Sequence, residues 1–194
     1  MLKQQYEQAI AEGERAIALD PNNADSYALQ ADALNLAGRP VEALRAVAQA
    51  MRLNPCYPPN YLFDLGLAYQ LTGRYAEAIV ALKEALSRSP NFIPAHNVLA
   101  RSYWLQWLSQ QSRAAQMLAP AVAAAQRAVA LNDSLNVSHV FLGFTFLYQQ
   151  QYEQVLAEME RAVALDPTEA NSHAALAEVL SRMGRTEEAL EAAA

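Results

Sequence analysis

The sequence predicts an all-α protein built as an array of helix pairs, and three observations lead to this fold class. Alanine, the strongest helix former, accounts for 40 of the 194 residues, whereas only 8% are aromatic. A short segment that ends in Leu-Asp-Pro or a close variant recurs along the chain. After each such segment, apolar and small residues return at the three- and four-residue steps of a helix face.

The recurring segment sets the expected domain organisation. Its copies end at Pro21, Pro55, Pro90, Asp133 and Pro167. Successive ends are 34, 35, 43 and 34 residues apart, and a period of 34 is typical of two-helix repeats. We therefore expect one array with these repeats: 1–23 (second helix only), 24–58, 59–92, 93–135, 136–169 and 170–194 (truncated). The repeat at 93–135 carries an insertion of nine residues, the difference between spacings of 43 and 34.

Within each repeat, turn chemistry separates the two helices. Gly38, Gly73 and Gly184 are each followed by Arg, which predicts a left-handed glycine at the end of the first helix. Pro40 and Pro120 are expected at the first position of the second helix. Small residues form two columns on the second helix, where they let helix axes approach closely. The columns are Ala9, Ala43, Ala78, Ala121 and Ala189, and Ala16, Ala50, Ala85, Ala128 and Ala162.

These features resemble the tetratricopeptide repeat (TPR) family over nearly the whole chain. The resemblance implies a right-handed superhelix of antiparallel helix pairs, a TPR-like α-solenoid whose first helices line a concave face that binds protein segments. The chain departs from the family pattern at Val155, at Gln30 and at three histidines. A fainter similarity, over residues 51–100, is to arrays attached to bacterial adenylate or guanylate cyclases and other signalling proteins.

Counting along the first helices gives the residues expected to line the concave groove. They are Asp25, Asp32, Asn35, Asn60, Phe63, Leu67, Asn97, Arg101, Trp104, Val140, Phe144 and Tyr148. This groove is acidic at its N-terminal end and apolar in the middle. The family's carboxylate clamp for chaperone tails needs Lys, Asn and Arg at set columns. Here those columns hold Ala28, Asp32, Phe63, Leu67, Pro94 and Val98, so we expect no binding of such tails.

Two features of the groove have two interpretations each. The segment Val140–Tyr148 is apolar on almost every face and needs a cover. That cover is either the inserted segment, through Trp104, Trp107 and Leu108, or a partner peptide or helix. The acidic residues Asp25, Asp32 and Asp64 either favour a ligand with basic residues or are solvated residues near helix starts.

Nothing in the sequence indicates catalysis, a cofactor or a metal site, so we expect no enzyme. The histidines His96, His139 and His173 occupy one column of successive repeats. Repeat spacing holds them on the order of 10 Å apart, too far to share a metal ion, and a packing role is expected. The single cysteine, Cys56, has no metal-ligand or disulfide partner in sequence. A formal charge of −6 disfavours nucleic acid, and no apolar run is long enough to span a membrane.

The sequence therefore predicts a cytoplasmic protein-interaction scaffold that holds a partner peptide or helix in its concave groove. The alternative is a regulatory or self-assembly module of a larger protein, such as a signalling enzyme. Because repeat arrays normally need polar terminal caps, the incomplete end repeats also suggest contacts with other copies of the chain.

Overall fold

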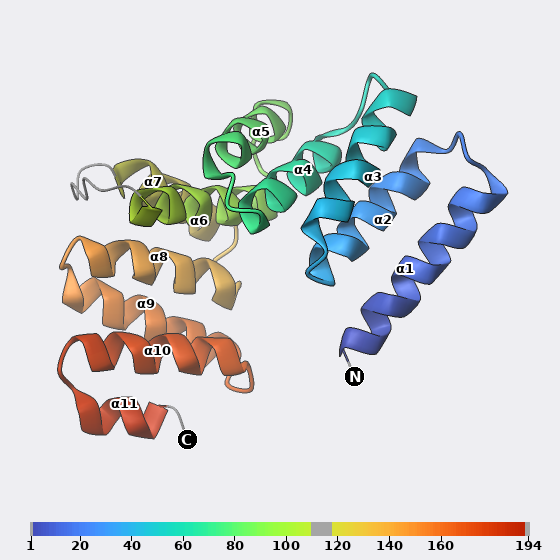
Figure 1. Cartoon of the computed structure of the whole chain (residues 1–194). Helices are drawn as coiled ribbons and strands as arrows, with labels where there is room; N and C mark the ends of the chain where they lie inside the picture. Colours follow the sequence, from blue (N-terminus) through green and yellow to red (C-terminus); the bar gives the residue numbers. More distant parts are fainter. Residues whose placement is uncertain (1, 110–117, 193–194) are drawn as a thin grey trace. The chain divides into compact units, whose positions relative to one another are not determined.

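The computed structural model describes residues 2–109 and 118–192, without the side chains of residues 2, 3, 148 and 171. This part of the chain is helical and contains no strand (Figure 1), which confirms the all-α class. The helices are α1 (Leu2–Leu19), α2 (Ala24–Leu36), α3 (Pro40–Leu53), α4 (Pro59–Leu71), α5 (Tyr75–Arg88), α6 (Ile93–Ser109), α7 (Ala119–Leu131), α8 (Asn136–Tyr148), α9 (Tyr152–Leu165), α10 (Ala170–Arg182) and α11 (Thr186–Ala192). Within the described ranges, no helix is both long and apolar enough to cross a bilayer.

The chain forms two compact units, Met1–Val98 and Leu99–Ala194, and the division falls within α6. In the N-terminal unit, consecutive helices pack from α1 to α5, and the first helices α2 and α4 also touch each other. In the C-terminal unit, consecutive helices pack from α7 to α11, and α8 touches α10 in the same way. Packed consecutive helix pairs are the architecture that the sequence predicts.

The predicted repeat with the insertion has a longer first helix than its neighbours. Helix α6 has 17 residues, compared with 13 in α2 and α4, and ends at Ser109. Residues 110–117, which hold most of the insertion, lie outside the described residues. Helix α7 begins at Ala119, so Pro120 occupies the second helical position and not the predicted first. Either place suits proline, because the amide hydrogens of the first turn have no partner within the helix.

The turns between paired helices follow the predicted glycine chemistry. Gly38, Gly73 and Gly184 have φ of 73°, 78° and 78°, which is the left-handed conformation that glycine adopts without strain. The fourth such turn has Gln150 at φ 60°. Its amide still donates to the Leu147 carbonyl at 3.1 Å, just as Gly38 donates to Asn35. Helix packing therefore imposes this turn even on a residue with a side chain.

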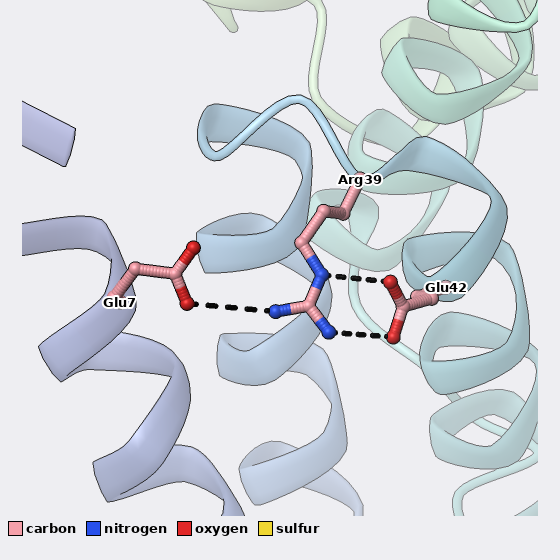
Figure 2. Close-up of polar contacts among 3 residues, drawn as sticks. All are labelled: Glu7, Arg39 and Glu42. Atoms are coloured by element: carbon pink, nitrogen blue, oxygen red, sulfur yellow. Dashed lines mark hydrogen bonds and ion pairs between the residues drawn. The ribbon is translucent and has the colours of Figure 1, made fainter.

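The arginine after each of these glycines clamps the start of the second helix. Figure 2 shows Arg39, whose Nε and one terminal nitrogen donate to the two carboxylate oxygens of Glu42, each at 2.7 Å. Its other terminal nitrogen lies 3.6 Å from Glu7 of α1. Arg74 with Glu77 and Arg185 with Glu188 repeat the pairing. These pairs are half-exposed, so their effect on stability is small, and their main effect is to orient the turn.

Small residues hold the helices of each unit close together. In the two predicted columns, these alanines are fully buried: Ala43, Ala78, Ala121, Ala50, Ala85, Ala128 and Ala162. Ala9 and Ala16 of α1 differ, because they face an open hollow of about 530 Å³ between α1 and α2. Gly66 of α4 is one site of close approach, where an added Cβ would lie 2.7 Å from Cγ of Leu82.

The histidine column secures the connections between successive repeats. The Nε2 atom of His96 lies 2.9 Å from the Pro90 carbonyl, and His173 and His139 make the same contact with the residue six positions earlier. On α2, the Tyr27 hydroxyl donates to the Pro21 carbonyl at 3.3 Å. Because a carbonyl only accepts, each Nε2 carries a proton in this arrangement. The geometry supports a structural role for the three histidines.

Candidate acidic groove on the first helices

Four of the predicted groove residues of the N-terminal unit line a pocket between α2 and α4. Asn23 caps α2 by accepting hydrogen bonds from the amides of Asp25 and Ser26 at 3.0 and 3.2 Å, and α4 starts at Pro59. The pocket has a volume of about 460 Å³. It is lined by Asp25, Ala28, Leu29, Asp32, Asn60, Phe63 and Asp64. Helical counting alone had placed Asp25, Asp32, Asn60 and Phe63 on one face, and the structure brings them together.

One rim of this acidic pocket is held by a tyrosine. The buried Tyr61 hydroxyl donates to Oδ1 of Asp25 at 2.6 Å. Burial first, and then the hydrogen bond to Asp25, raise the pKa of Tyr61 to about 12, so the hydroxyl remains a donor at neutral pH. Asp25 itself is exposed in the first turn of α2, where a carboxylate is favourable beside the helix N-terminus. Phe63 packs on Phe92, with 5.2 Å between ring centroids.

Deeper in the pocket, two carboxyl groups are partly deprived of water. Asp64 is only 5% exposed. Burial, and then the nearby charge of Asp32, raise its pKa to about 8. Burial also raises the pKa of Asp32 above its ordinary value. At neutral pH, Asp64 is therefore mostly protonated, so the interpretation of Asp64 as a solvated residue near a helix start is wrong.

Two side-chain amides join neighbouring first helices. Asn35 is 4% exposed, and its Nδ2 donates to the Asp64 backbone carbonyl at 3.0 Å. One repeat later, Nε2 of Gln70 donates to the Val98 carbonyl at 2.8 Å. Asn97 is likewise buried, and Leu67 is half-buried outside the pocket lining. The expectation that Asn35 and Asn97 are open to a partner is therefore not met, because both residues are buried.

One apolar residue of the predicted groove in the C-terminal unit, Phe144, packs on a side chain of the same chain. Trp104 of α6 stacks on Phe144 of α8, with 5.6 Å between centroids and 22° between ring planes. Arg101 lies beside this pair. Trp107 is 7% exposed and packs with Leu118 and Ala121. Val140 is half-buried, and the Tyr148 side chain lies outside the described residues.

Trp104 should therefore contribute to stability. We expect Trp104→Ala to lower the free energy of unfolding by about 2 kcal/mol, because it removes a half-buried indole and its stacking on Phe144. Urea unfolding followed by circular dichroism measures the loss. In a double-mutant cycle, Phe144→Leu should cost less in the Trp104→Ala background than in the native chain. Unchanged stability in both single variants would place Trp104 outside the core.

Sequence reasoning missed three parts of this surface. Leu29 lines the acidic pocket although it is 71% exposed, and it was not among the counted groove columns. A second hollow of about 390 Å³ lies over α3, α4 and α5, beside Val80. At its edge, Arg88 lies over the Tyr57 ring and Arg74 over the Tyr69 ring. The exposed Val80 on α5 was the available signal for this hollow.

Comparison with known proteins agrees with the architecture. Among solved structures, TTC0263, a thermophilic TPR protein from Thermus thermophilus, is 23% identical, with 96% of this chain and 87% of that chain aligned and a TM-score of 0.74. Human IFIT1, solved as a dimer with m7Gppp-AAAA, is 21% identical over 96% of this chain and 45% of that chain, with a TM-score of 0.78. YrrB, a TPR protein with an unusual peptide-binding site, is 20% identical over 93% and 88%, with a TM-score of 0.60. At these identities the likeness establishes the fold alone. A search of curated proteins found no match.

The fold defines the class as a helical-repeat protein. Models of the tetratricopeptide repeat match residues 13–45, 59–92 and 158–191, which together make up just over half of the chain. The chain belongs to the tetratricopeptide repeat family. Proteins of this family generally mediate protein–protein interaction, and their repeat scaffolds are generally not enzymes.

Proposed function

We propose that this protein is a scaffold that binds a segment of a partner protein along its first helices, with the pocket between α2 and α4 as a main contact. The observation that carries the proposal is the pocket itself. It combines three carboxyl groups with the apolar side chains of Leu29 and Phe63 between two adjacent first helices. A site with an apolar lining and a few placed polar groups is typical of ligand recognition.

The energetics favour binding without rearrangement of the scaffold. The hydrogen bonds donated by the side-chain amides of Asn35 and Gln70 hold neighbouring first helices in register before any ligand arrives. Little conformational freedom of the scaffold is then lost on binding, so more of the contact energy appears as affinity. Leu29 is 71% exposed, and among the apolar side chains that line the pocket it has the largest exposed fraction to bury against a partner.

The narrower predictions from the sequence remain part of this proposal. They comprise the repeat boundaries, a cytoplasmic location, no enzymatic activity, no nucleic-acid partner and no carboxylate-clamp binding of chaperone tails. The solved neighbour IFIT1 holds the capped oligonucleotide m7Gppp-AAAA, so the prediction against nucleic acid needs its own test. The similarity to cyclase-associated arrays and the self-assembly of copies also stay predictions.

The test is a peptide panel measured by fluorescence anisotropy with the full chain. The panel consists of labelled 12-residue peptides with leucine at alternate positions and a central residue that is cationic, anionic or neutral. At least one peptide class should bind, and Leu29→Gln should weaken it at least fivefold, because the variant removes apolar contact area at the pocket mouth.

Val80→Gln is the matched control, since Val80 is 68% exposed on α5 and lies at the other hollow. The same affinity for Val80→Gln and the native chain supports the groove. Equal losses for both variants, or a loss for Val80→Gln alone, would move the site away from α2 and α4. A panel that gives no binding at all contradicts the proposed function. A capped oligonucleotide in the same assay tests the prediction against nucleic acid.

A further inference from the structure

The feature that goes beyond a general peptide groove is the carboxyl group of Asp64. Asp64 is only 5% exposed, and it lines the pocket. Among residues 2–109 and 118–192, no group hydrogen-bonds or ion-pairs with this carboxyl. A carboxyl group that is shielded from water to this extent gains free energy from a hydrogen-bonding partner, because burial deprives it of most of its hydration. The open side of Asp64 is the pocket, so a partner group can reach it only from there.

The rest of the pocket indicates the chemistry of that partner group. Asp25 and Asp32 add two more carboxyl groups, and Tyr61 fixes the orientation of Asp25 through its 2.6 Å hydrogen bond. The walls beside them are apolar, formed by Ala28, Leu29 and Phe63. A long side chain with a hydrocarbon stem and a positive head matches both parts, because such side chains bury their stems along apolar surface. The head then forms charge-assisted hydrogen bonds with the carboxylates.

We propose that the pocket between α2 and α4 takes one lysine or arginine side chain of the bound segment, with its positive head between Asp32 and Asp64. This inference rests on the proposed function and names the residue type that the groove selects. An elongated cationic side chain fits the 460 Å³ volume, whereas no group of three carboxylates in the described ranges is placed to hold a metal ion.

Protonation gives the proposal a second observable. A positive head favours the ionised form of Asp64, whose pKa is raised in the empty pocket, so binding should release a proton. The titratable groups that line the pocket or touch its lining are Asp25 and Asp32 of α2 and Tyr61 of α4, and among them Asp32 acts on Asp64 by charge. Affinity for a cationic ligand should therefore rise between pH 6 and pH 9, whereas a neutral ligand should show no such rise.

The direct experiment uses small probes on the full chain. N-acetyl-lysine methylamide, N-acetyl-arginine methylamide and the neutral N-acetyl-norleucine methylamide are titrated while backbone amide resonances are recorded. The two cationic probes should shift the amides around Asp32 and Asp64, and the norleucine probe should not. In the peptide panel, replacement of the central cationic residue by norleucine should weaken binding at least tenfold. Asp64→Asn and Asp32→Asn should each reproduce most of that loss.

Glu153→Gln removes one exposed carboxylate from α9 and serves as the matched control for net charge. Equal losses for Glu153→Gln and Asp64→Asn would mean that charge attraction is nonspecific and would overturn the proposal. So would equal binding of lysine and norleucine peptides, or saturation of the pocket by Ca²⁺ or Mg²⁺ at micromolar concentration. If peptides bind through Leu29 without any preference for a cation, this inference fails and the proposed function stands. If neither peptides nor probes bind, both fail.

Discussion

Replacing Asp64 by asparagine is expected to stabilise the protein by up to about 5 kcal/mol at pH 9 and by less than about 1 kcal/mol at pH 4. The native carboxyl has a pKa near 8 in the folded state, compared with an ordinary value of 3.8. The folded chain therefore binds the proton more tightly than the unfolded chain does. Stability from this group is complete at low pH and is lost as the pH rises from about 4 toward 8, where the loss levels off. Asparagine has the shape of the protonated carboxyl and does not ionise.

Urea unfolding at pH 5, 7 and 9 measures this effect. The difference between Asp64→Asn and the native chain should widen with pH, whereas Glu153→Gln should follow the native profile. Parallel pH profiles for the native chain and Asp64→Asn would show that Asp64 titrates normally. A variant that is more stable yet loses cation binding would identify Asp64 as a residue that serves binding at the expense of stability, a common trade-off at functional sites.

Replacing Gly66 by valine is expected to lower the free energy of unfolding by about 3 kcal/mol or more. An ideal Cβ at this position lies 2.7 Å from Cγ and 3.0 Å from Cδ2 of Leu82, and 3.4 Å from the Ala78 carbonyl oxygen. Leu82 is fully buried, and the contacted Cγ is its branch point and not the far end of a flexible side chain. Helices α4 and α5 must separate to admit the new side chain. Gly66→Ala should cost less, because alanine's better helix propensity offsets part of the overlap.

Thermal and urea unfolding of three variants checks this explanation. Gly143 is the matched position in the C-terminal unit, but its close neighbour is the terminal methyl of Met159 at 2.7 Å, which a flexible side chain can move aside. Gly143→Ala should therefore cost less than Gly66→Ala. In the Leu82→Ala background, Gly66→Ala should become close to neutral. Equal costs at Gly66 and Gly143, or no relief in the Leu82→Ala background, would contradict the overlap with Leu82.

Most of the fold could be predicted because each repeat uses the same local chemistry. Gly38, Gly73 and Gly184 mark turns with a left-handed backbone. Glycine adopts this conformation without strain whatever its neighbours are, so the residue alone predicts the turn. The alanine columns are equally local, since a small side chain permits close packing against any neighbouring helix. The turn at Gln150 escaped prediction for the converse reason. There the surrounding helices impose a conformation that the residue does not favour.

The candidate site could be predicted only in part, because burial depends on the neighbouring repeat. Helical counting placed Asp25, Asp32, Asn60 and Phe63 on one face, and that periodicity survives in the structure. Counting cannot tell whether Asp64 points to water or lies against α2, since the answer depends on how closely the two first helices approach. The same holds for Asn35, whose amide is used by the adjacent helix, and for Trp104, whose stacking partner is 40 positions away at Phe144.

The side-chain hydrogen bonds between first helices affect how the sequences of such repeat arrays can diverge. In both cases the donor is a side chain of one repeat, whereas the acceptor is a main-chain carbonyl of the next, at Asp64 and Val98. Every residue type offers that carbonyl, so the accepting repeat can change its side chain at this position without breaking the bond. A duplicated repeat is thus compatible with its neighbour from the outset and needs no paired substitution. Relatives can then drift to low sequence identity while each copy keeps its register with the next.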